Sequence, residues 1–226
     1  MVSSRPLTPT THAIEVEKPK DFAFLATQFT FLQLQTEDGM EVRPMSLATS
    51  PTRTHLEYAA RLSDSGYKRA FASLRPGDEV IVFGPIGDFV LNETRPAILI
   101  AGGIGITPLI GMAEYAADQV LPIPIRLAYS NPSENEIAYR VELGALEKQN
   151  PGFRVRYTLT QTADPGWRGA TGRIDRSLLQ QLARDLADPV YYISGTPSMV
   201  VATWRLLREE GIREDAIEFE AFRGYA

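Results

Sequence analysis

The sequence of 226 residues contains no cysteine and only two histidines, His12 and His55. Without thiolates, the chain cannot form a disulfide, a cysteine-ligated iron–sulfur cluster, a thiolate zinc site or a thiol nucleophile. Two histidines also exclude a histidine-rich metal centre, and we expect that the chemistry needs no metal. That chemistry is therefore expected from an organic cofactor, or from hydroxyl and carboxylate groups.

Long hydrophobic runs and basic stretches are missing as well. No apolar run approaches the roughly 20 residues of a membrane span, and the N-terminal segment MVSSRPLTPTTH lacks the apolar core of a signal peptide. The net charge of −5 is spread over both halves of the chain, which argues against a surface for nucleic acid or anionic membrane. We therefore expect a cytoplasmic protein that binds neither nucleic acid nor membrane.

The strongest local signal is a glycine-rich stretch, AILIAGGIGITP, over residues 97–108. An apolar strand would end in the glycines, Thr107 would cap a helix, and Pro108 would take the first helical position. Such a turn directs free backbone N–H groups and a positive helix end toward one point, which favours a phosphate. The stretch matches neither the dinucleotide fingerprint GxGxxG nor a Walker A loop. An ordinary strand-to-helix turn explains it equally well. Its glycines are Gly102, Gly103 and Gly105.

Two regions of different pattern predict a two-domain fold. Residues 10–95 contain short strands separated by turns, with one short helix in SGYKRAFASL, and DFVLN is expected to be the last strand. This pattern is typical of an antiparallel β-barrel. From Ala97 onward, strands alternate with helices, as in a doubly wound α/β domain that binds ligands beyond the carboxyl ends of its strands. We place the barrel at 1–94 and the α/β domain at 95–226. Strands are expected at 97–101, 125–130, 153–160, 190–194 and 216–220, and helices at 108–118, 135–149, 175–187 and 198–210.

Two shorter stretches of the barrel region carry chemistry of their own. In RPMSLATS, the Arg43 guanidinium could donate two parallel hydrogen bonds to a diphosphate, and the Ser46 hydroxyl could reach a ring nitrogen or a ribityl oxygen. An edge-strand arginine followed by a turn serine is the alternative. In GYKRAF, the helix start could hold a second part of the same phosphate. A solvated basic helix end is the alternative there.

Several motifs in one order resemble the ferredoxin–NADP reductase family from about Val42 to the C-terminus. They are RPMSLATS, GYKRAF, LRPGDEV, GPIGDF, AGGIGITP, YISGTPSMV and EAFRGY. The resemblance implies an FAD-binding barrel, followed by a domain that binds NADH or NADPH. It further implies hydride transfer from nicotinamide to flavin, and then electron transfer to a separate acceptor such as a ferredoxin-type carrier.

The resemblance also assigns roles to individual positions. Arg43 would bind the FAD diphosphate, and Met45 stands where the family usually has a tyrosine that stacks on the flavin. Ser194 stands where the family often has a cysteine beside the nicotinamide, and Thr107 would face the same pocket. The further FAD contacts implied are Pro44, Ser46, Tyr58, Leu62, Gly66, Tyr67, Lys68, Arg69 and Phe222. The nucleotide contacts implied are Gly102, Gly103, Gly105, Thr107, Pro108, Ser130, Gly195 and Pro197. The residues implied in the reaction are Ser46, Ser194, Glu220 and Phe222, and Tyr225 is a second ring candidate.

Cofactor preference and role stay open at this point. After the second strand of the α/β domain, residues 129–132 read Tyr-Ser-Asn-Pro, and no arginine follows before Arg140. This favours NADH over NADPH, because a 2′-phosphate is commonly met by arginine. Three functions are compatible with the sequence: an FAD-dependent reductase of a carrier protein, an NAD(P)H:flavin reductase that uses flavin as substrate, and a non-catalytic nucleotide-binding partner subunit. The second function is retained because Met45 replaces the tyrosine that usually stacks on the flavin.

Overall fold

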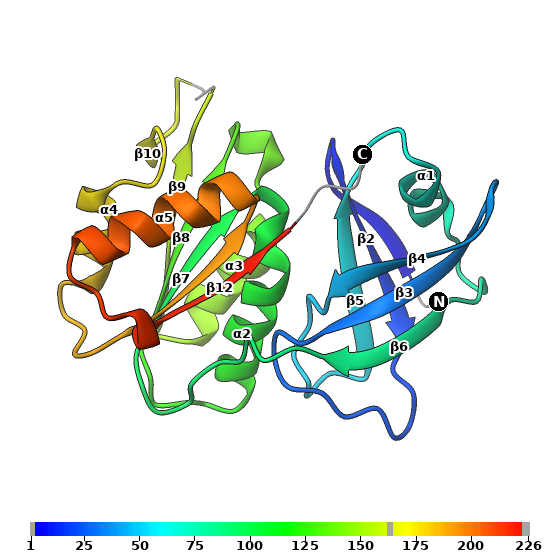
Figure 1. Cartoon of the computed structure of the whole chain (residues 1–226), viewed down its shortest axis with the longest axis horizontal. Helices are drawn as coiled ribbons and strands as arrows, with labels where there is room; N and C mark the ends of the chain where they lie inside the picture. The colour runs from blue at the N-terminus through cyan, green and yellow to red at the C-terminus, as the bar shows by residue number, and fades with distance from the viewer. Residues whose placement is uncertain (1–2, 162–164, 223–226) are drawn as a thin grey trace.

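Two lobes lie side by side along the long axis of the computed structural model, which describes residues 3–161 and 165–222 (Figure 1). The N-terminal lobe is built from strands β1 to β6 and helix α1. The C-terminal lobe is a parallel sheet covered by helices on both faces. β6 ends at Ile86 and β7 begins at Ala97. We propose that the domain boundary expected at residues 94–95 lies in this connection.

The N-terminal lobe consists of two antiparallel three-stranded sheets, in the orders β1-β2-β5 and β4-β3-β6. Buried and more exposed residues alternate along β3, as expected for a sheet with one face on a core. That core includes Ile14, Leu32, Leu56 and Tyr58, and α1 closes it with Phe71. The expected barrel-like architecture is therefore confirmed. The elements are β1 Ser3–Thr8, β2 Thr11–Glu17, β3 Phe29–Thr36, β4 Gly39–Ser46, β5 His55–Arg61, α1 Gly66–Ser73 and β6 Ile81–Ile86.

Two strands of this lobe differ from the prediction. β1 was not expected, because its sequence SSRPLT is mostly polar and contains Pro6; as an edge strand it tolerates that proline. The segment DFVLN, residues 88–92, is not a strand. Its apolar residues pack on the other lobe instead: the Phe89 ring lies 5.7 Å from the Tyr192 ring, and Leu91 is buried in a core shared with the C-terminal lobe.

The C-terminal lobe has six parallel strands in the order β10-β9-β8-β7-β11-β12. Helices α2 and α3 share one core cluster, and α4 and α5 share another on the opposite face of the sheet (Figure 1). The predicted doubly wound α/β domain is confirmed. Its strands are β7 Ala97–Gly102, β8 Ile125–Asn131, β9 Phe153–Leu159, β10 Ala170–Thr171, β11 Val190–Gly195 and β12 Ile217–Ala221. Its helices are α2 Ile106–Asp118, α3 Arg140–Gln149, α4 Arg176–Ala183 and α5 Pro197–Glu209.

The predicted cap at Thr107 is wrong. The residues Gly103–Gly105 form a short 3₁₀ helix, η1, and α2 follows directly from Ile106. Thr107 therefore lies within the first turn, where its Oγ1 donates to the carbonyl oxygen of Ile104 at 3.0 Å. Pro108 is the third helical residue rather than the first, and still needs no N–H there because the first turn has no intrahelical acceptor. Likewise, α3 begins five residues later than predicted, because Tyr139 has a φ of 58°.

A single hydrophobic core crosses the boundary between the lobes. Ala13, Ala48 and Ala59 of the N-terminal lobe belong to the same buried cluster as Ile110 and Ala113 of α2. Small residues let the backbones approach closely: a Cβ added to Gly111 in α2 would lie 3.0 Å from the carbonyl oxygen of Thr49.

Charged and polar contacts reinforce this junction. Arg5 pairs with Glu142 at 3.1 Å and Arg53 pairs with Asp118 at 3.1 Å. The Ser50 N–H donates to Glu114 at 3.1 Å. The lobes are therefore joined by apolar packing and polar contacts together. Among the described residues, no helix combines the length and the apolar character that a bilayer crossing requires.

Candidate functional site

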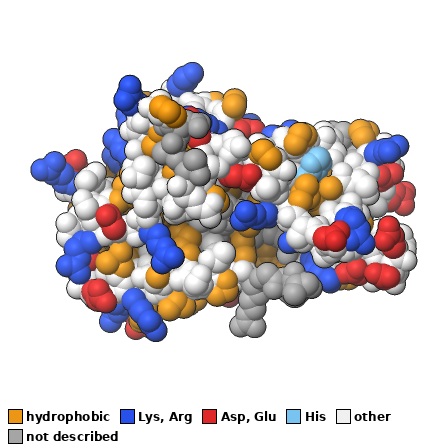
Figure 2. Space-filling view, turned by 90° about the horizontal axis from the view of Figure 1, so that it is seen from above, with side chains coloured by type: hydrophobic (Ala, Val, Ile, Leu, Met, Phe, Trp, Pro, Cys, Tyr) orange, Lys and Arg blue, Asp and Glu red, His pale blue; other side chains and the backbone are white. Residues whose placement is uncertain are grey.

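A cleft of about 810 Å³ lies between the two lobes, at the carboxyl edge of the parallel sheet. Figure 2 shows its opening between the lobes, with hydrophobic side chains inside. β7 and β11 are neighbours at this edge, and their crossovers leave the sheet toward opposite faces, which makes this the switch point of the doubly wound sheet. The predicted residues that line it are Arg43, Pro44, Met45, Ser46, Tyr67, Lys68, Gly102, Gly103, Thr107, Ser130, Gly195, Glu220 and Phe222.

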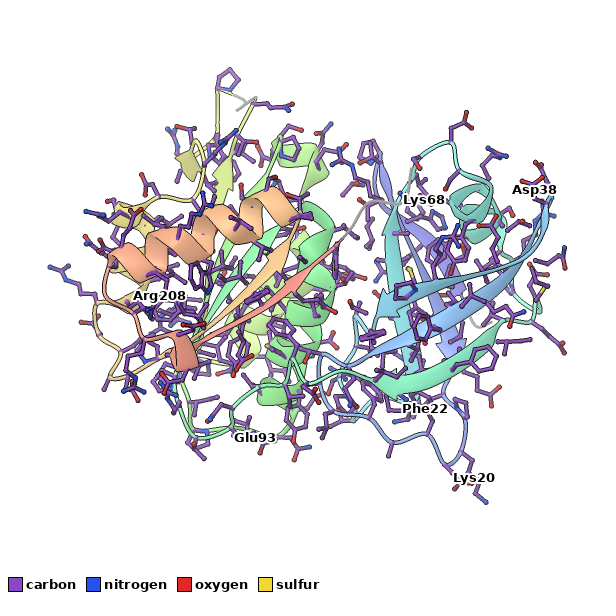
Figure 3. All side chains as sticks on the ribbon, in the orientation of Figure 1. Lys20, Phe22, Asp38, Lys68, Glu93 and Arg208 are labelled. Atoms are coloured by element: carbon purple, nitrogen blue, oxygen red, sulfur yellow. The ribbon has the colours of Figure 1, made fainter. Side chains whose placement is uncertain are left out.

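Three cations lie on the wall that the N-terminal lobe contributes: the predicted Arg43 and Lys68, and Arg61 at the end of β5. The Arg43 guanidinium, at β4, lies 5.3 Å above the centre of the Tyr67 ring, and it pairs with Glu41. Lys68 comes from the first turn of α1, where the Ser65 side chain caps the helix, and it lies on the side of α1 nearer the C-terminal lobe (Figure 3). Arginine, lysine and a helix start together form a favourable place for a diphosphate.

Three glycines lie in or directly behind the wall from the C-terminal lobe, each for a different reason: Gly102 and Gly103 line the cleft, and Gly105 lies behind it. A Cβ on Gly105 would lie 2.2 Å from the carbonyl oxygen of Ser194, so any side chain there would push η1 away from β11. A Cβ on Gly102 would lie 2.1 Å from the sulfur of Met199. Gly103 has a φ of +52° and nothing within 4 Å of its Cβ position. The chain can thus approach a nucleotide closely at the end of β7.

Ser46 and Glu220 connect the two walls. The Ser46 Oγ donates to Glu220 Oε2 at 3.3 Å, although the residues are 174 positions apart in the chain. Burial raises the pKa of Glu220 to about 7, and the hydrogen bond from Ser46 opposes that shift. The carboxyl group can therefore take up or release a proton near neutral pH. Beside it, the Phe222 N–H donates to the carbonyl oxygen of Gly195 at 2.9 Å, which fixes Phe222 at the cleft.

Other predicted site residues lie outside the lining of the cleft. Tyr58 is fully buried in the core of the N-terminal lobe, where its hydroxyl accepts from Thr30 Oγ1 at 2.9 Å. Ser194 is fully buried in β11, and its Oγ has no hydrogen-bond partner among the described residues. Arg69 is held outside by Asp64 and Glu37, at 3.1 and 3.2 Å. Leu62, Gly66, Gly105, Pro108 and Pro197 also lie outside the lining. Tyr225 lies outside the described residues.

Arg173 lines the cleft and was not predicted. The carbonyl oxygen of the preceding residue, Gly172, accepts from Thr158 Oγ1 at 2.7 Å, and Thr158 is the register partner of Ser130 on β8. Arg173 therefore follows a segment fixed beside the ends of β8 and β9. The sequence analysis expected such an arginine only directly after β8. Because parallel strands end at one edge, the turn after β9 can supply one to the same place.

The residues fit the cofactors that the resemblance implies. The cleft volume falls within the usual range for a cofactor pocket. It offers cations and a helix start on one wall, and a glycine turn at a sheet switch point on the other. This arrangement defines a two-domain flavin- and nicotinamide-nucleotide-binding oxidoreductase.

Comparisons with known proteins agree with this class. Residues 99–204 match the family described as "Oxidoreductase NAD-binding domain". One component of the Na⁺-translocating NADH-quinone reductase of Yersinia pestis is 30% identical over 161 residues, which are 67% of this chain and 39% of that protein. The glycine betaine monooxygenase reductase subunit of Chromohalobacter salexigens is 23% identical over 219 residues, 94% of this chain and 60% of that protein.

A solved structure shows the same fold over nearly the whole chain. The ferredoxin NADP⁺ reductase of Neisseria gonorrhoeae with bound FAD and NADP matches with a TM-score of 0.83 and 22% identity, and the match covers 97% of this chain and 96% of that one. Residues 99–204 are therefore an oxidoreductase NAD-binding domain, and the chain as a whole has the fold of the ferredoxin–NADP reductase-like, FAD- and nicotinamide-nucleotide-binding oxidoreductases. It spans about two-fifths of the length of the first curated relatives that it matches.

Proposed function

We propose that the chain is an NAD(P)H-dependent reductase that takes a hydride from the nicotinamide onto FAD and passes electrons to a separate acceptor protein. One observation carries the proposal: the Arg43–Ser46 segment and the Gly102–Gly103 bend open onto the same cleft from different lobes. Two cofactors held on these walls would meet between them, and alignment within a dry cleft is most of what a protein must add to hydride transfer.

The residues on the wall from the N-terminal lobe would hold FAD, which can accept two electrons together and release them one at a time. Arg43 and Lys68 would bind its diphosphate through charge-assisted hydrogen bonds. Met45 lines the cleft while packing on the core of the lobe, so its thioether is positioned to contact a ring. Phe222 would cover the cleft from the C-terminal side and exclude water.

The residues on the wall from the C-terminal lobe would hold the nicotinamide nucleotide. Gly102 and Gly195 end neighbouring strands and bring their backbones to the cleft beside Met199, and Thr107 lines the same region from α2. Glu220 would hold a proton at Oε1 and exchange it with the cleft, and Ser46 would orient that carboxyl by donating its hydroxyl to Oε2. Ser194, behind the cleft surface, would set the position of Gly105 through its backbone.

The acceptor and the compartment are part of the proposal. The betaine monooxygenase relative is by name a reductase subunit, so its electrons are destined for another component. A comparable carrier or oxygenase component is the acceptor that we propose here, because this sequence has no cysteine to bind an iron–sulfur cluster. We also propose NADH or NADPH as the reductant, because Arg173 in the cleft supplies the arginine whose apparent absence had favoured NADH. A cytoplasmic location, where such nucleotides are supplied, is part of the same proposal.

An anaerobic titration of the purified chain with NADH and with NADPH, followed by flavin absorbance, tests the proposal. We expect a yellow protein with stoichiometric FAD that bleaches on addition of nucleotide. A colourless protein that oxidises nucleotide only when free flavin is added would instead show a flavin reductase, which Met45 in place of an aromatic ring would favour. Nucleotide binding without bleaching would show a non-catalytic subunit.

A further inference from the structure

A second cavity, of about 230 Å³, lies at the junction of the lobes and shares no lining residue with the cleft. Strands β1, β2 and β5, the loop after β4, and helices α2 and α3 contribute to its walls. Neither the reaction nor the resemblance uses this cavity. Its lining residues are Arg5, Glu15, Ala48, Thr49, Arg53, His55, Glu57, Glu114, Tyr139 and Glu142.

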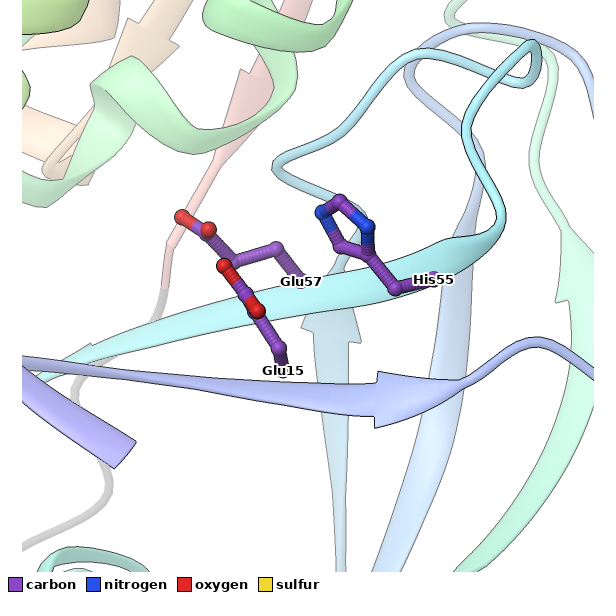
Figure 4. Close-up of side chains that lie close together, drawn as sticks. All are labelled: Glu15, His55 and Glu57. Atoms are coloured by element: carbon purple, nitrogen blue, oxygen red, sulfur yellow. The ribbon is translucent and has the colours of Figure 1, made fainter. Parts of the chain in front are cut away.

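Three of these side chains could ligate one cation. A nitrogen of His55 and a carboxylate oxygen each of Glu15 and Glu57 all lie within 4.8 Å of one another. Figure 4 shows the two carboxylates side by side, with the imidazole next to them. The backbone explains this placement, because Glu15 is the register partner of Glu57 across β2 and β5, and His55 precedes Glu57 by two residues on the same face.

The opposed carboxylates repel each other unless a positive charge lies between or beside them. Arg5 supplies part of that charge, at 3.2 Å from Glu57, but it also pairs with Glu142 at 3.1 Å. Arg53, the second arginine of the cavity, is paired with Asp118 at 3.1 Å. Since four glutamates and two arginines line the cavity, its walls keep a negative charge that favours a cation.

A hydroxyl group in the same cavity points independently to an occupant. Thr49 Oγ1 is buried, in a residue that is 2% exposed, and it has no hydrogen-bond partner in the described part of the chain. Buried polar atoms are nearly always hydrogen-bonded. A hydrated cation satisfies both requirements, since its charge meets the carboxylates and its remaining water can meet the hydroxyl of Thr49.

We propose that Glu15, His55 and Glu57 bind a divalent transition-metal ion, with zinc the best match. One imidazole and two carboxylates are donors that zinc accepts, and a water molecule would complete four-coordination. The composition excluded a histidine-rich centre, whereas this set needs one histidine. The ion would lie away from the cleft, so it would serve structure rather than electron transfer, and the proposal is independent of the proposed function.

Calorimetric titration of the EDTA-treated full chain with zinc chloride tests the site. We expect one ion per chain with a dissociation constant of about 1 μM or below, and a raised melting temperature. His55→Ala and Glu15→Gln should each weaken zinc binding at least about 10-fold. His12→Ala is the matched control, because it removes the only other histidine, which lies on β2 and contacts Ser4 at 2.7 Å.

Each outcome decides the matter. Loss of binding in His55→Ala and Glu15→Gln, with full binding in His12→Ala, supports the site. No stoichiometric binding to the native chain overturns it, and so does unchanged binding in a folded His55→Ala protein. Cobalt(II) gives a second readout: its visible absorption should be that of a nitrogen- and oxygen-ligated ion, and should disappear in His55→Ala but not in His12→Ala.

Discussion

Ser46 Oγ donates a hydrogen bond to Glu220 Oε2 at 3.3 Å, which links the end of β4 in one lobe to β12 in the other. The two side chains come from opposite halves of the chain and meet in the cleft. Their contact places a carboxyl group with a raised pKa in the part of the cleft where the flavin and the nicotinamide are expected to meet.

Glu220 should make stability depend on pH in a predictable direction. Burial raises its folded-state pKa to about 7, whereas the unfolded value is about 4.3. The folded state therefore binds more protons between these values. The contribution is fully present below about pH 4.3 and is lost as the pH rises through 7. Between pH 5 and 8 we expect a loss of about 2 kcal/mol from this group, after allowance for its partial exposure.

Denaturant unfolding at several pH values checks this. The neutral variant Glu220→Gln should show a flatter profile over the same range, with the difference from the native chain growing toward pH 8. Parallel profiles for the two proteins would assign the pH dependence to other groups.

Replacement of Arg43 by alanine should reduce FAD occupancy more than nucleotide binding. A charge-assisted hydrogen bond contributes about 1.5–3 kcal/mol, so we expect FAD affinity to fall about 10- to 100-fold. Flavin absorbance after gel filtration measures occupancy, and fluorescence titration measures NADH binding. Arg69→Ala is the control, because Arg69 lies on nearby α1 but pairs outward with Glu37 and Asp64. Equal losses of FAD and NADH, or none, would count against the diphosphate role.

Alanine at Gly105 should disturb the nucleotide turn. Its Cβ would lie 2.2 Å from the Ser194 carbonyl oxygen, and neither backbone segment can move without breaking sheet or helix contacts. We expect a loss of several kcal/mol in stability, or a displaced turn with nucleotide binding weakened at least about 10-fold. Gly144→Ala is the control: this residue lies in α3 with open space around its Cβ position, so alanine should stabilise by about 0.5–1 kcal/mol.

Arg173 should discriminate between the two nicotinamide nucleotides. In Arg173→Ala we expect the KM for NADPH to rise about 10-fold and that for NADH to stay within about twofold, because only NADPH carries the extra phosphate for a guanidinium. Arg140→Ala is the control: Arg140 pairs with Glu134, outside the lining of the cleft. An equal effect on both nucleotides in steady-state assays would show that Arg173 contacts a part they share.

The sequence predicts most of the fold because local pattern determines most of it. Alternating strands before residue 95 and the strand–helix alternation after Ala97 predict both architectures, and the glycines of η1 locate the end of β7. β1 and DFVLN were misjudged because packing against the rest of the molecule, not local pattern, decides their state. Tyr58 shows the same limit: its strand runs beside the cleft, but the side chain points into the core.

Individual residues of the candidate site could be predicted only where they belong to a recognisable sequence motif. The Ser46–Glu220 contact depends on how the two lobes pack, and no short stretch of sequence contains that information. Arg173 reaches the cleft because parallel strands end together, and that geometry becomes useful only once the strand order is known. Ser46 and Glu220 were each predicted, but their contact and the place of Arg173 in the cleft follow only from the tertiary structure.

The buried cluster that runs from Ala13 and Ala48 into α2 has a consequence for how the protein folds and unfolds. Neither lobe can separate without exposing the apolar interface between the lobes to water, so the two should melt as one calorimetric transition. A cofactor must then enter through the rim of an assembled protein, and truncation of either half should cost the other its solubility.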